Sequence, residues 1–482
     1  MQEYINENLI SYKNFLCGKS CAVLGVGISN IPLIKFLLEC GANVVARDKK
    51  SLSELSANKD LDIPAFEKKG VLFVTGEEYL DDIHEEVVFK TPGIRADHPK
   101  IKEAAERGSL ITSEMEVFLS VCPCKIIAIT GSDGKTTTTT LTSKLLEDAG
   151  YTVHLGGNIG RPLLYDTEKM RPGDFAVLEL SSFQLHSIGF YPDRRLPVQT
   201  VRFPDVAIIT NISPNHLDWH TSYEEYAQAK KAIFLSLRFG GKFVTNAADE
   251  ITARYAEEAR EKGMNVKLFS AKVKTADYYA DGEYIYYEGK PIIARNEIKL
   301  PGVHNTENYM AAIAATSEYV SLENVLNIAR TFGGVEHRLE FVKEIDGVSF
   351  YNSSIDSSPT RTIAAIKSFS SDMKKKLVLI MGGYDKNIPY APVGEPVCEM
   401  AKAVFLCGAT APKIKAAIEE ANNEEKPEIF MFDDFEETVI FAKKYAKEGD
   451  RVILTPASAS FDMFRNFEHR GRFFKEVVEK LK

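Results

Sequence analysis

The feature that most constrains the fold of this chain is a buried strand followed by a glycine-rich loop and a helix, between residues 126 and 148. The β-branched run Ile126 to Ile129 has the composition of a buried parallel strand. Gly131 and Gly134 interrupt this run, and a helical pattern begins near Thr136. The order of strand, glycine loop and helix predicts an α/β fold.

The same stretch carries the residue types of a nucleotide-phosphate site. Backbone N–H groups of such a loop, together with the N-terminus of the helix, favour an anion. In the pattern Thr130-Gly131-x-x-Gly134-Lys135-Thr136, Lys135 is placed to reach the outer phosphates and the Thr136 hydroxyl to bind Mg²⁺. The common form of the loop has a glycine at position 129, so this is a shorter variant. We expect an ATP or GTP site; the alternative is a glycine turn that happens to precede a lysine.

The length and composition of the chain limit the number of domains and the classes of partner. The 482 residues are too many for one core and predict two to four domains. The net charge of −9 argues against a general affinity for nucleic acid or an anionic membrane. No apolar run approaches the roughly 20 residues of a membrane span, and the N-terminus lacks a signal-peptide pattern. Seven scattered cysteines fit a reducing cytosol, and we interpret Cys122-Pro-Cys124 as two core thiols rather than a redox pair.

Residues 1–122 are expected to form a first α/β domain. The predicted elements are the strands Ser20–Leu24, Asn43–Ala46 and Val87–Lys90 and the helix Ile31–Leu38. The loop Gly25-x-Gly27 resembles a dinucleotide fingerprint whose third glycine is replaced by Asn30. We interpret it as a loop that binds a diphosphate rather than NAD. The turn Thr91 to Ile94 follows the third strand, so both loops lie at carboxyl ends of strands and are placed for one ligand.

Residues 123–334 are expected to form a domain around the phosphate loop. Further strands are predicted at 152–155, 175–178 and 206–210, and polar groups follow the last two. Glu179 ends a buried strand near the nucleotide and is the natural second Mg²⁺ ligand, the alternative being a solvated loop acid. His216, Asp218 and His220 have no cysteine or third close histidine to complete a zinc site.

Later parts of the chain continue the same pattern. A helix at Tyr223–Phe234 carries the adjacent lysines Lys230 and Lys231, and residues 277–299 predict a hairpin. Asn305 is a plausible N-cap for a helix at Tyr309–Tyr319. From Val335 to the C-terminus a third α/β domain is expected, with strands at 349–351, 377–381, 403–406 and 452–454. The loops after these strands, which include Asp385, Lys386 and Thr455 to Ser460, form a third ligand surface.

With these motifs in this order, nearly the whole chain resembles the Mur ligases. The phosphate loop and the segment Asn211 to His216 resemble the family as a whole. A narrower resemblance is to the members that add D-glutamate to UDP-N-acetylmuramoyl-L-alanine. The segments that carry it are Glu179-Leu180-Ser181-Ser182-Phe183-Gln184-Leu185, His337-Arg338, and Ser460 with Asn466-Phe467-Glu468-x-Arg470-Gly471. The family fold has three domains: an N-terminal Rossmann-like UDP-binding domain, a central P-loop ATPase, and a C-terminal Rossmann-like domain that closes over the site.

The resemblance implies roles for individual residues. ATP is expected at Gly131, Ser132, Asp133, Gly134, Lys135, Thr136, Thr137, Asn305, Asn308 and Arg338. Two Mg²⁺ ions are expected, one at Thr136 and Glu179 and one at His216 and a carbamylated Lys230. The UDP-sugar is expected at Ser29, Asp48, Thr91, Gly93, Asn158 and Ser181, and the incoming amino acid at Lys386, Ser460 and Phe467. The catalytic set is Lys135, Glu179, His216 and Lys230.

One segment departs from the family pattern. The family usually shows Asp-Ser-Lys-Ala-Thr after the strand that ends at Asn352, whereas this chain has Ser353-Ser354-Ile355-Asp356-Ser357. Neither the acid nor the lysine stands at its expected place. Asp356, three residues downstream of the expected acid, is the candidate replacement. The missing lysine affects the expected contacts to the amino acid and leaves the ATPase core unchanged.

The chemistry that these residues suggest is amide-bond formation driven by ATP. A carboxylate is a poor acyl donor, so its attack on the γ-phosphate gives an acyl phosphate, which an amine then converts to an amide. Positioning and charge neutralisation by Lys135 and Mg²⁺ are the main catalytic factors. An acyl-enzyme route is disfavoured, because the sequence shows no evident His–Asp partners for Ser181 and Ser182 in the right context. Together with this chemistry, the resemblance implies a cytoplasmic, monomeric ligase of peptidoglycan-precursor synthesis, and the net charge argues against binding of nucleic acid or membrane.

Several alternatives stay open at this point. Within the same chemistry, the chain could add L-glutamate or another amino acid, or be a folylpolyglutamate synthetase. From other classes, it could be a nicotinamide-dependent dehydrogenase or a non-catalytic P-loop switch. The complete phosphate loop with Glu179 argues against the dehydrogenase, and ADP release that depends on an amino acid would argue against the switch.

Overall fold

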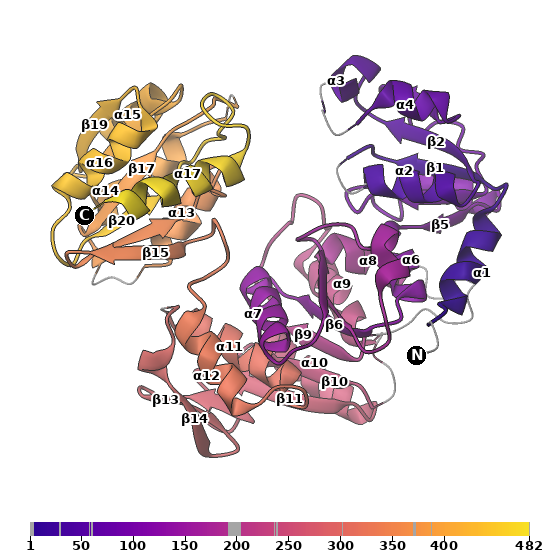
Figure 1. The fold of residues 1–482 in the computed structure, drawn as a ribbon, viewed down its shortest axis with the longest axis horizontal. Coiled ribbons are helices and arrows are strands. Elements are labelled where there is room, and N and C mark those ends of the chain that lie inside the picture. Colours follow the sequence, from indigo (N-terminus) through magenta and orange to yellow (C-terminus); the bar gives the residue numbers. More distant parts are fainter. Residues whose placement is uncertain are drawn as a thin grey trace. The chain divides into compact units, whose positions relative to one another are not determined.

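The fold is an α/β architecture with three sheets, each flanked by helices (Figure 1). It was obtained as a computed structural model, which describes residues 4–27, 30–56, 58, 61–190, 204–235, 237, 240–300, 302–369, 373–386 and 388–481. The chain divides into two compact units. The first comprises residues 1–298 and 303–330, and the second comprises residues 299–302 and 331–482.

The first sheet is fully parallel, with the strand order β3-β2-β1-β4-β5. Its strands are β1 (Ser20–Leu24), β2 (Asn43–Asp48), β3 (Leu72–Thr75), β4 (Val87–Lys90) and β5 (Leu110–Thr112). The helices of this part are α1 (Glu7–Leu16), α2 (Asn30–Glu39), α3 (Leu52–Ser56), α4 (Ile63–Lys68), α5 (Pro99–Glu106) and α6 (Glu114–Val121). The order reverses between β1 and β4, whose carboxyl ends carry the two predicted ligand loops.

The central sheet has nine strands in the order β14-β13-β12-β11-β10-β9-β6-β8-β7. Its strands are β6 (Lys125–Thr130), β7 (Val153–Gly157), β8 (Phe175–Glu179), β9 (Val206–Ile209), β10 (Lys242–Asn246), β11 (Asn265–Ser270), β12 (Tyr278–Ala280), β13 (Tyr284–Tyr287) and β14 (Lys290–Ala294). The pairs from β7 to β12 are parallel, and β12–β13 and β13–β14 are antiparallel, which confirms the predicted hairpin excursion. Because β8 and β9 both pair with β6, the segments that follow these three strands meet at one edge.

Helices and short 3₁₀ turns connect these strands. The helices are α7 (Lys135–Asp148), α8 (Ser182–Phe190), α9 (Tyr223–Leu235), α10 (Glu250–Glu261), α11 (Val303–Thr316) and α12 (Leu322–Thr331), and the turns are η1 (Leu164–Lys169) and η2 (Arg295–Glu297). One prediction is wrong here: Asn305 is not an N-cap, because α11 begins at Val303 and Asn305 lies buried inside its first turn. Gly302, with φ of +107°, directly precedes the helix.

The second unit contains a six-stranded sheet in the order β15-β16-β20-β17-β18-β19, antiparallel only at β15–β16. Its strands are β15 (Glu340–Ile345), β16 (Val348–Asn352), β17 (Leu377–Met381), β18 (Ala401–Cys407), β19 (Glu428–Phe432) and β20 (Arg451–Leu454). Its helices are α13 (Pro359–Lys367), α14 (Gly394–Met400), α15 (Ala411–Glu420), α16 (Phe435–Tyr445) and α17 (Phe467–Lys480), with a 3₁₀ turn η4 (Ala391–Val393).

The cores are built from the strands that the sequence analysis identified. Every residue of β8, β9, β16 and β17 is buried, as a strand covered on both faces requires. Cys122 and Cys124 are both buried and neither is in a disulfide, which confirms that they are core thiols. Within the described part of the chain, no helix combines the length and the apolar character needed to span a membrane.

Candidate functional site

The glycine loop after β6 is shaped by close contacts that only glycine permits. Gly131 has φ of +149°, and a Cβ atom there would lie 1.8 Å from Thr210 Oγ1. Gly134 has φ of +77°, and a Cβ atom would lie 2.3 Å from Asn308 Oδ1. Both contacts are far below van der Waals distance, so a side chain at either position would displace its neighbour. The loop is therefore held between the segment after β9 and helix α11.

The first turn of α7 is open to an anion. Its N-cap is Gly134, which provides no side chain to bond the first N–H groups of the helix. Lys135 lies in the first turn, and its Nζ donates to Gly131 O at 2.9 Å and to Ser132 O at 2.7 Å. The lysine therefore holds its charge at the loop, where N–H groups and the helix dipole favour phosphate.

Lys230 on α9 reaches the same loop from the other side. Its side chain is buried, and Nζ donates to Gly131 O at 2.8 Å and to Thr130 Oγ1 at 3.2 Å. Two amines, those of Lys135 and Lys230, thus share the carbonyl of Gly131. Burial, and then the positive charge of Lys135, lower the pKa of Lys230 well below its ordinary value. The neighbouring Lys231 is directed elsewhere and forms an ion pair with Glu258, with Nζ and Oε2 2.6 Å apart.

Glu179, the last residue of β8, has a buried carboxylate of which only one oxygen accepts a hydrogen bond in the described structure. Asn158 Nδ2 donates to its Oε1 at 2.9 Å. Its Oε2 is buried and has no hydrogen-bond partner in the described structure. A buried anionic oxygen without a partner is strongly unfavourable, so a cation is the group that fits there. Carboxylate oxygens are also ligands that Mg²⁺ prefers.

The segment after β9 anchors the loop by hydrogen bonds. Ser132 Oγ lies 2.8 Å from the hydroxyl of Tyr226, and Ser213 N donates to Ser132 Oγ at 2.9 Å. Asn211 Oδ1 accepts from Asp133 N at 3.0 Å. Ser132 and Asp133 therefore contribute their backbone and the Ser132 hydroxyl to loop structure, while the Asp133 side chain is exposed.

His216 lies in this segment with a backbone φ of +54° and is exposed. Its ring lies 5.0 Å from the ring of Phe183. Partial burial, followed by the charge of Lys135, lowers the pKa of His216, which favours the neutral imidazole that can bind a metal ion.

The two asparagines predicted near adenosine both lie on α11 beside the loop. Asn308 Oδ1 accepts from Thr138 Oγ1 at 3.2 Å, and Asn308 Nδ2 donates to Asn305 Oδ1 at 3.2 Å. The chain Thr138–Asn308–Asn305 fixes α11 against α7. Thr136 and Thr137, in the first turn of α7, are partly exposed.

The two predicted loops of the first sheet lie beside each other. A Cβ atom at Gly25 would be 3.2 Å from Thr91 Cγ2, and Thr91 N donates to Leu24 O. Asp48, at the end of β2, accepts from Val26 N through Oδ2 at 2.6 Å. Ser29 lies outside the described residues. The loops therefore meet at one edge, as predicted, with Asp48 bonded to the glycine loop.

Polar contacts tie this first sheet to the central part of the same unit. Gly93 O accepts from Trp219 Nε1 at 2.9 Å, and Arg95 forms an ion pair with Glu225 at 2.7 Å. The guanidinium of Arg95 also lies 4.9 Å from the Trp219 ring centre. Arg95 and its hydrogen bonds lower the pKa of Glu225 to about 2. Both Trp219 and Glu225 come from the region between β9 and the middle of α9, which also carries His216.

Ser181 has a local structural role. Its Oγ accepts from Gln184 N at 3.2 Å, and Gln184 Oε1 accepts from Ser181 N at 2.9 Å. This reciprocal pair is a capping box at the start of α8. The capping box accounts for Ser181 and Gln184 in the segment Ser181-Ser182-Phe183-Gln184 by a structural role that needs no ligand.

The predicted residues of the second unit lie on loops of its sheet. Ser460 is buried, and its carbonyl accepts from Phe464 N at 2.8 Å. Lys386 is exposed in the loop after β17, and Phe467 opens α17 with its ring 6.0 Å from that of His337. Arg338 is exposed between His337 and Leu339, which both have positive φ.

The segment Ser353 to Ser357 is held by the buried Arg470 of α17. The guanidinium donates to Ser354 Oγ and Ser354 O, and also to the carbonyls of Ser458 and Ala459. Asp356 is buried and accepts from Thr455 Oγ1 through Oδ2 at 3.0 Å. Burial raises the pKa of Asp356 to about 6. This acid is therefore part of the loop packing after β16 and β20.

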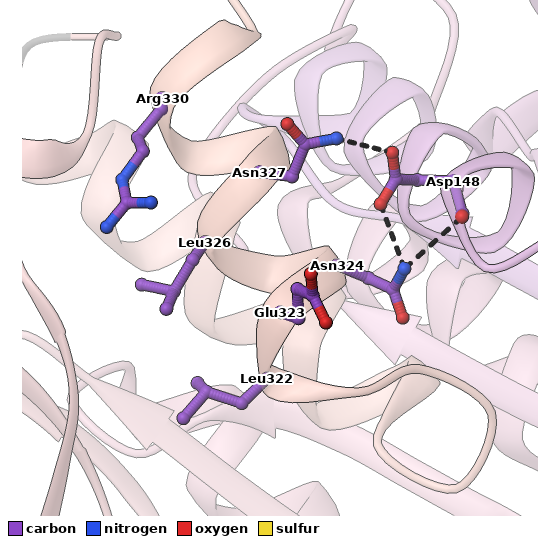
Figure 2. A pocket seen from close by; sticks show the side chains of 7 residues that line it. All are labelled: Asp148, Leu322, Glu323, Asn324, Leu326, Asn327 and Arg330. Atoms are coloured by element: carbon purple, nitrogen blue, oxygen red, sulfur yellow. Dashed lines mark hydrogen bonds between the residues drawn. The ribbon is translucent and has the colours of Figure 1, made fainter.

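A separate concavity of about 440 Å³ lies away from the phosphate loop, at the opposite end of α7. Figure 2 shows Asp148 bonded to Asn324 and Asn327 of α12, while Leu322, Leu326 and Arg330 project from the other side of that helix. A helix of 14 residues is about 21 Å long, so this hollow is remote from Lys135. It contains none of the predicted site residues.

Three residues contact the glycine loop in ways that the sequence analysis did not assign. Thr210 fills the space at Gly131, Asn211 bonds the Asp133 backbone, and Tyr226 bonds Ser132. Thr210 and Asn211 end a strand that was recognised, so their position at the shared edge was the available signal. For Tyr226 the available signal was its place one turn before Lys230, in the stretch Tyr226-x-x-Ala229-Lys230 that resembles the family.

Comparison with known proteins agrees with this geometry. The Mur ligase middle domain matches residues 129–316, and the family described as Mur ligase, glutamate ligase domain matches residues 337–458. The UDP-N-acetylmuramoylalanine--D-glutamate ligase of Clostridium beijerinckii is 47% identical over 475 residues, covering 98% of each chain.

Two solved structures share the fold. UDP-N-acetylmuramate-alanine ligase MurC from Thermotoga maritima has a TM-score of 0.54 at 18% identity, covering 96% of this chain and 100% of that one. MurF ligase from Thermotoga maritima, solved in complex with ADP, has a TM-score of 0.51 at 18% identity and covers 96% of each chain.

Proposed function

This chain belongs to the Mur ligase family, and we propose that it joins D-glutamate to UDP-N-acetylmuramoyl-L-alanine in an ATP-dependent reaction of peptidoglycan-precursor synthesis. The choice of both substrates is supported by the 47% identical relative, whose name specifies them. The observation that carries the chemistry is the position of Lys135, whose Nζ lies in the glycine loop at the carbonyls of Gly131 and Ser132. This arrangement suits a site that neutralises phosphate charge.

The reaction follows from the groups at this edge. The terminal carboxylate of the UDP-sugar attacks the γ-phosphorus of ATP, the bond to the β-phosphate oxygen breaks, and ADP leaves. The amine of D-glutamate then attacks the acyl phosphate, releases phosphate and forms the amide. Lys135 and the first turn of α7 hold the phosphates in line and stabilise the charge that develops on them.

Two Mg²⁺ ions are proposed as cofactors, supported by the donors that the chain offers. Thr136 and Glu179 would hold one ion, and His216 and a carbamylated Lys230 the other. The unpartnered Oε2 of Glu179 fits such a charge. The ions would supply neutralisation of the phosphate oxygens. Lys230 with a lowered pKa has the neutral amine that reaction with CO₂ requires, and the resulting carbamate is an anion.

The remaining assignments follow the order of the chain. We propose domains at residues 1–122 for the UDP-sugar, 123–334 for ATP and 335–482 for the amino acid. The UDP-sugar would contact Ser29, Asp48, Thr91, Gly93, Asn158 and Ser181, and ATP would also contact Asn305, Asn308 and Arg338. Lys386, Ser460 and Phe467 would hold D-glutamate. A cytoplasmic, monomeric enzyme is proposed, acting without nucleic acid or membrane.

A phosphate-release screen tests the function directly. The purified enzyme is given ATP and Mg²⁺ with UDP-N-acetylmuramoyl-L-alanine and one amino acid at a time, and the amide product is identified by mass. We expect release only when both the UDP-sugar and D-glutamate are present. Faster amide formation with L-glutamate or a diamino acid would refute the amino-acid assignment.

The first sheet is tested by a binding measurement. Calorimetry with the UDP-sugar should give a binding isotherm, and NAD should give none at the same concentration. NAD binding in the micromolar range, without binding of the UDP-sugar, would overturn the interpretation of the Gly25 loop.

A further inference from the structure

Three side chains with metal-binding groups gather at the edge of the central sheet opposite the phosphate loop. They are Cys124, His154 and Asp174, and their ligand atoms all lie within 4.8 Å of one another. Cys124 directly precedes β6, Asp174 directly precedes β8, and His154 is the second residue of β7. None of these residues has a role in the ligase reaction proposed above.

The strand register explains why the three side chains meet. Lys125 is paired with Phe175, which brings the preceding residues Cys124 and Asp174 to the same level. His154 is paired with Ala176, two residues beyond Asp174. Since side chains alternate along a strand, all three residues lie on one face of the sheet. The meeting therefore follows from the sheet β6-β8-β7 itself and not from a chance rotamer.

Their surroundings combine a buried thiol with two partly accessible ligands. Cys124 is fully buried, whereas the side chains of His154 and Asp174 are each 16% exposed. His154 Nε2 lies 2.9 Å from Asp174 Oδ2, and Arg171 N donates to the same oxygen at 3.0 Å. The hydrogen bonds therefore already orient the carboxylate and the imidazole, and both of these side chains are partly accessible to solvent.

We propose that Cys124, His154 and Asp174 bind a zinc ion. Thiolate, imidazole and carboxylate are the ligands that zinc takes in proteins, with bonds of about 2.0–2.3 Å. A tetrahedral ion then spaces its ligand atoms roughly 3.5 Å apart. The three ligand atoms, which lie within 4.8 Å of one another, would adjust to that spacing when the ion binds. On binding, the thiol proton of Cys124 is released to solvent, and a water molecule completes the four ligands.

The location gives this site a structural role. β6 leads into the phosphate loop, β8 ends at Glu179, and β7 ends next to Asn158. The ion joins the amino ends of these three strands, and strands of five or six residues place it roughly 17–20 Å from the groups at their carboxyl ends. It is thus distinct from the proposed Mg²⁺ ions and stabilises the strands that hold their ligands.

Cobalt provides a probe that separates this site from the catalytic one. Full-length enzyme, freed of metal with a chelator that is then removed, is titrated with Co²⁺ in the presence of Mg²⁺ and ADP. Cobalt bound to a thiolate gives a charge-transfer absorption, and no cysteine is among the residues proposed for the catalytic site. We expect this absorption at one Co²⁺ per chain, and its displacement by one equivalent of Zn²⁺.

Variants assign the absorption to residues. Cys124→Ser should abolish the charge-transfer band, and His154→Gln and Asp174→Asn should each weaken Co²⁺ binding at least about tenfold. The matched control is Cys122→Ser, which removes another buried thiol two residues away and should keep the band. Wild-type enzyme should also unfold at a higher temperature with Zn²⁺, and His154→Gln should lose this shift.

The outcomes decide the proposal even if one variant folds poorly. A wild-type titration without the thiolate band overturns it by itself. Retention of the band in Cys124→Ser, or its loss in Cys122→Ser, would assign the band to another thiol and also overturn it. A band that persists in Cys122→Ser and weakens in both His154→Gln and Asp174→Asn supports it.

Discussion

Two loop edges of this molecule have the same origin, but their buried charged groups are satisfied to different degrees. At the central sheet, the segments after β6, β8 and β9 bring Lys135, Lys230 and Glu179 together, and Glu179 Oε2 keeps no hydrogen-bond partner. At the second unit's sheet, the segments after β16 and β20 surround Arg470, which makes five hydrogen bonds to them. Both edges are carboxyl ends of parallel strands.

This difference in hydrogen bonding indicates which of the two edges needs a bound ligand. A buried charge is stable only when it is paired or fully hydrogen-bonded. Arg470 meets this condition within its own unit, so its loops are fixed without any other molecule. Lys230 and Glu179 do not meet this condition without a ligand. Burial lowers the pKa of Lys230, and one carboxylate oxygen of Glu179 has no hydrogen-bond partner in the described structure. The central edge therefore needs a bound ligand to satisfy its buried groups, whereas the loops of the second unit have a scaffold around Arg470 that is complete before the proposed D-glutamate binds.

The largest expected effect is on the scaffold. Arg470→Met leaves several buried oxygens of Ser354, Ser458 and Ala459 unpaired, so the free energy of unfolding should fall by about 3–5 kcal/mol. Urea unfolding measures this change. The control is Arg472→Met on the same helix, an exposed position expected to change stability by less than about 0.5 kcal/mol. If Arg470→Met and Arg472→Met lowered the free energy of unfolding equally, Arg470 would not be the group that stabilises this edge.

The next effect concerns the central edge, where activity and not stability should be lost. Lys135→Ala removes a charge that stabilises the transferring phosphate, and phosphate release should slow by about 10²–10³-fold. Its unfolding curve should match the wild type. Lys144→Ala, an exposed lysine on the same helix, should keep full activity. Near-native turnover of folded Lys135→Ala would refute the phosphate-site assignment.

A smaller loss, with chemical rescue, is expected at Lys230. Lys230→Ala should lower activity by about 10–100-fold, because the proposed carbamate that supports a metal ion is lost. Acetate, a small carboxylate, should restore part of that activity. Lys231→Ala is the matched control and should be mild, since Lys231 pairs with Glu258 instead. A fully active Lys230→Ala, or an inactive Lys231→Ala, would contradict the carbamate.

The smallest expected effect is a pH dependence of stability that arises from Asp356, in the loop that Arg470 holds. The pKa of Asp356 is raised to about 6, so the native protein keeps this proton while the unfolded chain, with a pKa near ~3.9, loses it. Stability due to Asp356 is therefore full below about pH 4 and falls as the pH rises to about 6. Asp356→Asn stays neutral, so its stability relative to wild type should rise by about 2 kcal/mol between pH 4 and 7. A difference that does not vary with pH would contradict this.

Local sequence patterns were sufficient for many elements. The bounds predicted for β1, β4 and β17 are those of the structure, because each is an apolar run between polar residues. They were not sufficient for β15 and β19, which were not predicted. Charged residues interrupt β15, and the apolar run at 429–432 in β19 consists of residues that are partly or fully exposed. The start of α11 was also misjudged, because the residue type of Asn305 suits a cap while its side chain packs against Asn308.

The sequence by itself determined the order of strand, glycine loop and helix, the lysine and threonine of the phosphate loop, and the family resemblance. These depend on neighbouring residues and on spacing along the chain. Only the tertiary structure decided that Lys230 reaches the carbonyl of Gly131, 99 residues away, and that Asn158 bonds Glu179. The physical reason is the strand order β9-β6-β8-β7, which sets the distances between loops and which no local pattern encodes.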